Sequence, residues 1–354
     1  MKGPIVLSHA GAVTSLGHSA SETAFMYRAQ GTGLRLSALV DPESGAELLA
    51  GGLPTLEPRL VGVERALELG KLALEDLWTE GGAALGGRKL RLWLCLDEWL
   101  TEPDERGAVP SAELTSELRK FARARFGEQL DVRVCAMGAA APGRVLEDAL
   151  TELAQGEVEG LILGGVHTDQ SPARVRQLSA QQRLYAGENM DGVVLGDAAG
   201  FVTLFELAGA RRAGVPTRAR LMALGTGHDK ARPDNHESAF EAAGLTLAVR
   251  RATEALRAQK LRLGWQINDL ACEGYRLSEW ISVMTRTQAI WEEPQVSDSP
   301  AQRLGNLGAA TLPVQLALAL EAWRRGYAPH QRLLCLAGSD DGFRVALQLE
   351  APSA

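Results

Sequence analysis

The chain has 354 residues and 45% of them are apolar, which is enough to bury one large core or two medium ones. A formal net charge of -7 argues against a nucleic-acid-binding protein, because phosphate recognition needs a basic surplus. No apolar run reaches membrane-spanning length and the N-terminus lacks a signal-peptide pattern, so we expect no membrane association and a cytoplasmic location.

Amphipathic helices alternate with short apolar strands along the chain, which indicates an α/β protein with covered sheets. In the first half the expected helix–strand pairs are 63–78 with 89–99, and 141–156 with 158–166. In the second half they are 247–261 with 267–275, and 311–326 with 331–339. The shared order indicates two copies of one unit, 1–208 and 209–354, packed as one integrated structure.

Four segments carry a resemblance to one enzyme family. They are IVLSHAGAVTSLGHSASETAFMYRAQGTGL (5–34), NMDGVVLGDAAGFVTLFE (189–206), AGLTLAVRRATEALRAQKLRLGWQINDLACEGY (243–275) and RLGNLGAATLP (303–313). In this order they resemble four parts of the β-ketoacyl synthases of the thiolase-like superfamily. These are the first strand and helix, a strand hairpin with an acidic residue between glycines, the helix and strand before a catalytic His, and the loop that carries another His or Asn. The resemblance covers nearly the whole chain, although residues 35–110 are shorter and less similar. It implies a thiolase-like fold, with two pseudo-duplicated α/β halves in a layered αβαβα sandwich.

The family's nucleophile is a thiol at the turn between a strand and a buried helix, where the helix N-terminus lowers the thiol pKa. DVRVCAMGAAAPG (131–143) matches this strand and turn, and it offers two alternatives. Counting back along the helix from Gly156 places Ala139 at the nucleophile position and Cys135 upstream in the strand. An inserted helical turn would restore Cys135. We favour Ala139, because an insertion into a packed core helix is costly.

The resemblance implies two further catalytic positions. Where the family has His before Gly, this chain has Glu273. An ionised carboxylate only accepts hydrogen bonds, so we expect Glu273 to pair with an arginine such as Arg276. New chemistry centred on Glu273 stays open. Asn306 matches the Asn of chain-initiating synthases, although Asn beside Gly is also ordinary turn chemistry.

The family's glycine-rich gate is replaced here by AGSDDGFRVAL, in which Asp340 and Asp341 argue against an apolar acyl tunnel. Two carboxylates without further ligands favour a solvated loop over a metal site. His167, which follows a strand end, is a weaker candidate that we expect near the same pocket. The cysteines stand far apart at positions 95, 135, 272 and 335, so we expect no metal and no cofactor.

Together these positions predict a catalytically degenerate ketosynthase-like protein. We expect a non-catalytic partner or accessory subunit, either chain-length-factor-like or an adaptor or chaperone. The resemblance implies that the strand at 131–137 pairs across a two-fold axis in a homodimer, or in a heterodimer with a ketosynthase-like subunit. An acyl carrier protein or another protein client is a further expected partner. The alternative is a divergent acyltransferase or condensing enzyme that uses Cys135 with Asn306. That alternative requires Cys135 to be accessible and to have a lowered pKa.

Overall fold

The strands of the two halves follow one shared order. In the computed structural model, which describes residues 3–101, 109–233 and 239–352, the first-half strands are β1 (Ile5–Thr14), β4 (Leu90–Leu96), β5 (Asp131–Ala136), β6 (Gly160–Thr168) and β7 (Leu195–Glu206). The second-half strands are β8 (Ala219–His228), β9 (Leu263–Ile267), β10 (Trp291–Asp298), β11 (Arg332–Gly338) and β12 (Phe343–Glu350). A hairpin of β2 (Arg35–Val40) and β3 (Glu47–Gly51) pairs with β7 off the main path.

The main path runs β10-β9-β11-β12-β8-β1-β7-β6-β4-β5. When the five strands of each half are numbered in chain order, both halves have the order 3-2-4-5-1 from the outer end of the path to its middle. In both halves the fifth strand is antiparallel to its two neighbours. Pairing of β1 with β8 joins the halves into one continuous sheet. The structure therefore contains one α/β unit twice. The division at residue 208 stays a prediction, and it falls between the end of β7 and the start of β8.

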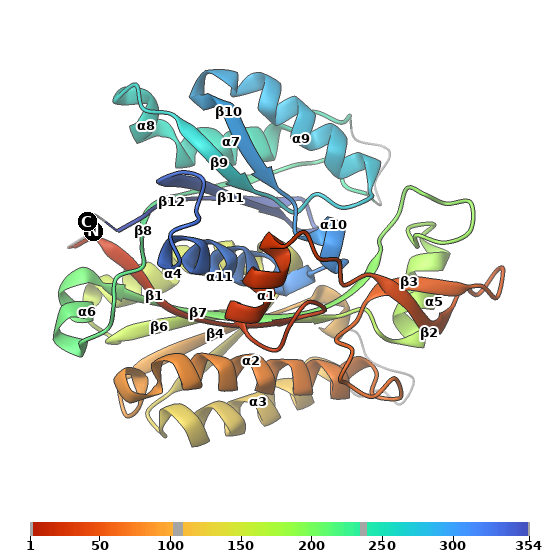
Figure 1. Cartoon of the computed structure of the whole chain (residues 1–354), viewed down its shortest axis with the longest axis horizontal. Coiled ribbons are helices and arrows are strands. Elements are labelled where there is room, and N and C mark those ends of the chain that lie inside the picture. Colours follow the sequence, from red (N-terminus) through yellow and green to blue (C-terminus); the bar gives the residue numbers. More distant parts are fainter. Residues whose placement is uncertain (1–2, 102–108, 234–238, 353–354) are drawn as a thin grey trace.

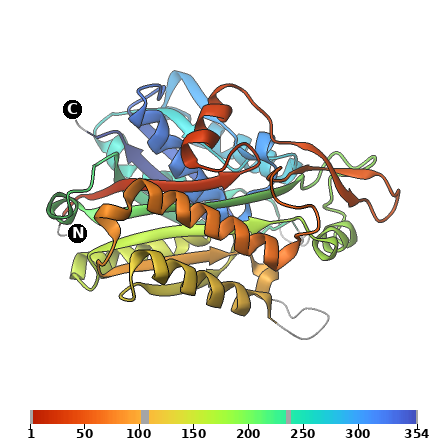
Figure 2. The same cartoon turned by 60° about the horizontal axis from the view of Figure 1, so that its bottom comes forward.

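Helices form three layers around the two groups of strands (Figure 1). The outer layers are α2 (Gly62–Leu85) with α3 (Pro110–Phe126), and α7 (Ala243–Ala252) with α8 (Glu254–Ala258) and α9 (Gly274–Arg286). The middle layer is α4 (Ala141–Gln155) with α11 (Thr311–Arg324). Figure 2 shows α2 and α3 lying across the first-half strands. The layered αβαβα sandwich expected from the sequence is therefore confirmed.

Shorter elements connect these layers. They are α1 (Ala20–Arg28), α5 (Pro172–Ala180), α6 (Leu207–Ala213) and α10 (Ala301–Leu304), with 3-10 turns η1 (Glu98–Thr101), η2 (Gly138–Ala140), η3 (Gln288–Ile290) and η4 (Gly308–Ala310). No helix in the described ranges is both long and apolar enough to cross a membrane.

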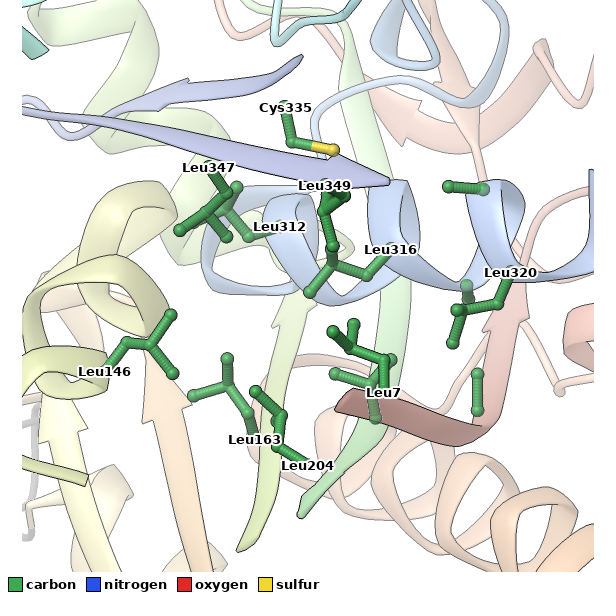
Figure 3. Close-up of a cluster of buried hydrophobic side chains, with 14 of the residues drawn as sticks. Leu7, Leu146, Leu163, Leu204, Leu312, Leu316, Leu320, Cys335, Leu347 and Leu349 are labelled. Carbon is green, nitrogen blue, oxygen red and sulfur yellow. The ribbon is translucent and has the colours of Figure 1, made fainter. Parts of the chain in front are cut away.

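One large core cluster lies where the middle helices meet both groups of strands, and another lies between α2, α3 and the first-half strands. Every residue of α11 from Thr311 to Ala322 is buried, as expected for a helix enclosed on all sides. In contrast, α4 buries one face and exposes Arg144, Glu147 and Asp148 on the other. Figure 3 shows the leucines between the layers, each of which stabilises the fold by about 1.5–3 kcal/mol when fully buried. They include Leu7, Leu146, Leu163, Leu204, Leu312, Leu316, Leu320, Leu347 and Leu349.

Two expected elements differ from the structure. The strand expected at 267–275 is instead β9 at Leu263–Ile267, because the polar side chains that follow it accept hydrogen bonds from backbone amides. Asn268 Oδ1 accepts from Leu270 N at 3.2 Å, and Asp269 Oδ2 accepts from Gly338 N at 2.8 Å. The helix expected at 247–261 is interrupted between α7 and α8.

Candidate functional site

A cavity of about 260 Å³ lies at the edge of the fold where loops of both halves meet. Five residues selected from the sequence line it, namely Ala139, Glu273, Asn306, Asp340 and Asp341. Its wall is strongly charged, with six carboxylates and four arginines among the lining residues. These are Asp97, Glu98, Asp269, Glu273, Asp340, Asp341, Arg174, Arg183, Arg232 and Arg276. Such a wall does not suit an acyl chain, because hydrocarbon placed against charged side chains removes their hydration at a cost in free energy.

Ala139 lies in the tight turn η2 between β5 and α4. Gly138 opens this turn with a φ of 69°, in the left-handed region that favours glycine. Ser339 fastens the turn from the other half, because its Oγ accepts from Ala140 N at 2.9 Å and donates to the Met137 carbonyl at 2.5 Å. The turn between strand and buried helix therefore presents a methyl group to the cavity, and no nucleophile.

The second central helix begins with the same sequence. Gly308, Ala309 and Ala310 form η4 directly before α11, as Gly138 to Ala140 form η2 before α4. Gly308 also has a positive φ of 40°. This repeated Gly-Ala-Ala turn fits the duplication, and the two turns contact each other.

Cys135 lies in β5, opposite Cys95 of β4, and is half-buried. No cysteine in the described chain lines the cavity. Burial raises the pKa of all four thiols, and for Cys135 the carboxylates of Glu98 and Asp341 add to this while Arg144 opposes it. A reactive thiol needs the opposite shift, and none of the four cysteines has the lowered pKa that the family's nucleophile requires.

Glu273 is ion-paired, but its partner is Arg183 and not the expected Arg276. Arg183 Nε donates to Glu273 Oε1 at 2.9 Å and its Nη1 donates to Asp340 Oδ2 at 2.8 Å. Arg276 Nη2 instead donates to the Gly338 carbonyl at 2.7 Å. Burial raises the pKa of Glu273 although the charge of Arg183 opposes this. Arg183 comes from the loop after α5, far away in sequence, so nothing near Glu273 indicated it.

Asp340 and Asp341 lie in the turn between β11 and β12, and their side chains are 44% and 29% exposed, so the loop is partly solvated as expected. Burial opposes ionisation of Asp340, but the charges of Arg183 and Arg276 outweigh it and lower its pKa. Asp341 Oδ2 accepts from Arg144 Nη1 at 3.1 Å. Both carboxylates are therefore held by arginines. In the parts of the chain that the structure describes, no three His, Cys, Asp or Glu side chains are grouped to hold a metal ion.

A buried charge network lies behind the cavity, and the sequence analysis identified only part of it. His167 Nδ1 lies 2.6 Å from Asp97 Oδ2 and its Nε2 lies 2.9 Å from Asp169 Oδ2. Burial alone would lower the pKa of His167, but Asp169 and Asp97 outweigh it and raise that pKa to about 10. His167 is therefore an imidazolium between two carboxylates. It lies near the cavity, as expected, directly behind the lining residue Asp97, and it does not line the cavity itself.

Asn306 belongs to the same network. Its Nδ2 donates to Asp169 Oδ2 at 3.0 Å, and its Oδ1 accepts from Gly308 N at 3.1 Å. The Asn306 side chain thus caps a turn, as the sequence allowed, and it links the η4 turn to the buried carboxylate of Asp169. One signal for this network was present, because Asp97 and Asp169 directly follow the neighbouring parallel strands β4 and β6, whose ends meet at one edge.

Glu98, in the η1 turn after β4, was not singled out by sequence. Its Oε1 is buried and has no hydrogen-bond partner, although it lines the charged cavity. Burial, followed by the charge of Asp97, raises the pKa of Glu98 to about 7. The carboxyl lies against the η2 turn, because a Cβ built on Gly138 would lie 2.6 Å from Glu98 Oε2.

Comparison with known proteins rests on structure. No family model and no curated protein matches the sequence. A type II polyketide synthase acyl-carrier protein in complex with its ketosynthase bound to the hexaketide matches with a TM-score of 0.78 at 13% identity, over 99% of this chain and 100% of the other. The ishigamide ketosynthase/chain length factor matches with a TM-score of 0.74 at 16% identity, over 100% of both chains. A β-ketoacyl synthase from Burkholderia phymatum STM815 matches with a TM-score of 0.73 at 15% identity, over 99% and 100%.

The agreement extends along the whole chain, with little identity in sequence. The resemblance inferred from the four sequence segments is therefore confirmed at the level of the fold. The chain has the thiolase-like fold, in the form shared by ketosynthases and a chain length factor.

Proposed function

We propose that this protein is a non-catalytic subunit with a ketosynthase fold, which acts through contacts with other proteins. The observation that carries the proposal is Ala139, a methyl group at the strand-to-helix turn that the family uses for its nucleophile. Acyl transfer through a thioester needs a thiolate at this place. The proposal includes a chain-length-factor-like role beside an active synthase and an adaptor role beside another client.

The rest of the cavity supports this proposal. Glu273 is held by Arg183 as an acceptor, so it is not free to donate to a developing oxyanion. Asn306 Nδ2 is bonded to Asp169. The acyltransferase alternative, with Cys135 acting together with Asn306, receives no support from these contacts, since Cys135 lies in β5 outside the cavity that Asn306 lines.

A partner surface is available at the end of the strand path. Among the residues that the structure describes, β5 pairs with β4 on one side and with no strand on the other, so this edge offers backbone groups for pairing. Arg133 and Val134 are exposed on this strand, and α4 exposes a polar face nearby. We propose that β5 pairs across a two-fold axis in a homodimer, or in a heterodimer with a ketosynthase-like subunit. An acyl carrier protein or another client, and a cytoplasmic location, belong to the same proposal.

Incubation with short and long acyl-CoA and acyl-carrier thioesters, read by intact mass, tests the absence of catalysis. We expect no acyl adduct, while an active ketosynthase treated in parallel becomes acylated. A stable acyl mass that maps to Cys135 and disappears in Cys135→Ala would overturn the proposal and favour the acyltransferase alternative.

A further inference from the structure

We propose that a second cavity, between β9, β10, α1 and α11, binds a free aromatic amino acid, with its ammonium group at Asp298 and its carboxylate at Arg28. This site shares no lining residue with the charged cavity, and it is independent of the proposed subunit role. Three observations support it: a space that the strands and two helices enclose, aromatic rings in its wall, and two opposite charges in that wall without an ion pair.

The strand register builds one wall of this cavity. β9 and β10 are parallel, and Trp265 pairs with Val296. Ile267 pairs with Asp298, two residues further along. Because side chains alternate between the two faces of a strand, these four side chains lie on the same face of the strand pair. All four residues line the cavity.

Helices α1 and α11 form the opposite wall, on the side of β9 and β10 that faces the middle layer (Figure 1). Ala24, Tyr27 and Arg28 line the cavity from α1, at the spacing that places side chains on one helix face. Leu318 and Ala322 line it from α11, four residues apart. The two alanines are buried and offer only methyl groups, so the helices leave space in front of the strands.

The volume of the space limits the size of the ligand. The cavity measures about 230 Å³, which is below the roughly 300–1,000 Å³ of sites for drug-sized molecules. The matching molecule is therefore small, with room for one ring and a short polar end.

Aromatic rings in the wall favour a ligand that has a ring itself. Trp265, Tyr27 and Tyr327 line the cavity from a strand, a helix and the loop after α11, and both tyrosines are partly exposed. Trp265 is held in place, because its Nε1 donates to Asp298 Oδ2 at 2.8 Å and its ring packs edge-on against Trp323 with centroids 5.6 Å apart. Aromatic pairs contribute about 0.5–1.5 kcal/mol beyond the area that they bury.

Two groups of opposite charge line the same cavity. Asp298 is partly exposed and accepts from Trp265 Nε1 and, at 3.4 Å, from the Tyr27 hydroxyl, which are both neutral donors. It has no ion pair within the described ranges. Arg28 is exposed and lies over the Tyr327 ring at 4.4 Å, and in those ranges its guanidinium has neither an ion pair nor a hydrogen bond. Hydrogen bonds to an ionised partner are about twice as strong as neutral ones, so each group favours a ligand of the opposite charge.

Other ligand classes match less of this wall. An amine without a carboxylate leaves Arg28 unmatched and is repelled by its charge. A carboxylate without an ammonium is repelled by Asp298 in the same way. The two charges together indicate a ligand that carries both signs, and the rings indicate its side chain, so an aromatic amino acid matches all three features.

Saturation-transfer NMR of the full chain with three matched probes tests this site. L-Phenylalanine has both charges, 2-phenylethylamine lacks the carboxylate and 3-phenylpropionate lacks the ammonium, while all three carry the same phenyl ring. We expect L-phenylalanine to bind at least tenfold more tightly than either of the other probes at pH 7. Equal affinities of the three probes, or no transfer to L-phenylalanine, would overturn the proposal.

Two variants assign each charge to its group. Asp298→Asn keeps an oxygen acceptor for Trp265 Nε1 and removes the charge, so the affinity for L-phenylalanine should fall at least tenfold and that for 3-phenylpropionate should not fall. Arg28→Gln changes an exposed side chain, so the fold does not depend on it. Here the affinity for L-phenylalanine should again fall at least tenfold, and that for 2-phenylethylamine should not fall.

This crossed pattern separates lost recognition from a damaged fold, because damage would weaken all three probes in a variant. Asp148→Asn is the control, since Asp148 is exposed on α4 outside the cavity, and it should leave all three affinities unchanged. Unaltered L-phenylalanine binding in either cavity variant, or an equal loss for all three probes in both, contradicts the proposal.

Discussion

Gly138 lies against the carboxylate of Glu98 so closely that a Cβ at position 138 would be 2.6 Å from Glu98 Oε2. Gly138 also has a φ of 69°. A side chain at position 138 is therefore disfavoured twice, by the left-handed backbone conformation and by the collision with Glu98. The two effects are separable, because Gly156 at the end of α4 has a similar φ of 75° and nothing within 4 Å of its built Cβ.

Replacement of these glycines by alanine measures the contact with Glu98. Gly156→Ala should destabilise the protein by about 1–2 kcal/mol, which is the cost of a left-handed alanine. Gly138→Ala should cost measurably more in urea unfolding, because Glu98 must also move. Adding Glu98→Ala to Gly138→Ala should remove the extra part. Equal losses of unfolding free energy in the two glycine variants would show that the contact with Glu98 does not affect stability.

The raised pKa of Glu98 predicts how stability depends on pH. Its pKa is about 7 in the folded protein against 4.5 ordinarily, so the folded state binds more protons between these values. The contribution of Glu98 to the free energy of unfolding is fully present below pH 4.5. It is lost as pH rises through 7, which lowers that free energy by up to about 3 kcal/mol. Glu98→Gln should therefore be more stable than the wild type at pH 8 and similar at pH 5. Glu147→Gln is the control and should keep the wild-type dependence of unfolding free energy on pH. The same dependence in Glu98→Gln would refute this prediction.

The imidazolium of His167 predicts a large effect of mutation. His167→Ala leaves Asp97 and Asp169 buried without their shared cation, which should cost about 3–5 kcal/mol in the free energy of unfolding at pH 7. The exposed His18 is the control, and His18→Ala should change stability by less than about 0.5 kcal/mol.

The same histidine also predicts a loss of stability in base. Its pKa is raised from 6.5 to about 10, so its contribution is complete below pH 6.5 and is lost as pH rises through 10. Denaturant unfolding at pH 7 and pH 10 should show a larger loss for the wild type than for His167→Ala. Parallel losses in both proteins would mean that His167 is neutral in the fold.

The two ends of the strand path provide a matched test of assembly. Val134 on β5 is 37% exposed and Val296 on β10 is 36% exposed. If β5 is the interface strand, Val134→Asp should shift the sedimentation velocity towards the monomer, and Val296→Asp should leave the oligomer unchanged. A shift in Val296→Asp but not in Val134→Asp would place the interface on β10. If the purified wild type is itself a monomer, the heterodimer is favoured over the homodimer.

Much of the fold was predictable from local patterns. Helical spacing that ends at Gly156 and Gly326 located the two central helices, since glycine in the left-handed region ends a helix. Counting back from Gly156 then placed Ala139 at the turn and Cys135 in the strand, as the structure has them.

The site was less predictable, because its contacts join distant parts of the chain. Arg183 reaches Glu273 and Asp340 from a loop 90 and 157 residues away. The raised pKa of Glu98 depends on a wall built from both halves. Neither the ion pairs of Arg183 nor the surroundings of Glu98 produce a periodic pattern in the sequence from which they could be predicted.

The duplication gives the strand path two unlike ends. At β10 the sequence WEEPQVSD places Pro294, which has no N–H, between acidic and polar residues, and this protects an edge against further pairing. At β5 the sequence DVRVCA has no proline. Contact between β5 and β10 of successive copies would propagate without end, whereas contact between two β5 strands closes after one step. We therefore expect the difference between the two repeats to limit growth, with β5 pairing with one partner and Pro294 hindering further pairing at β10.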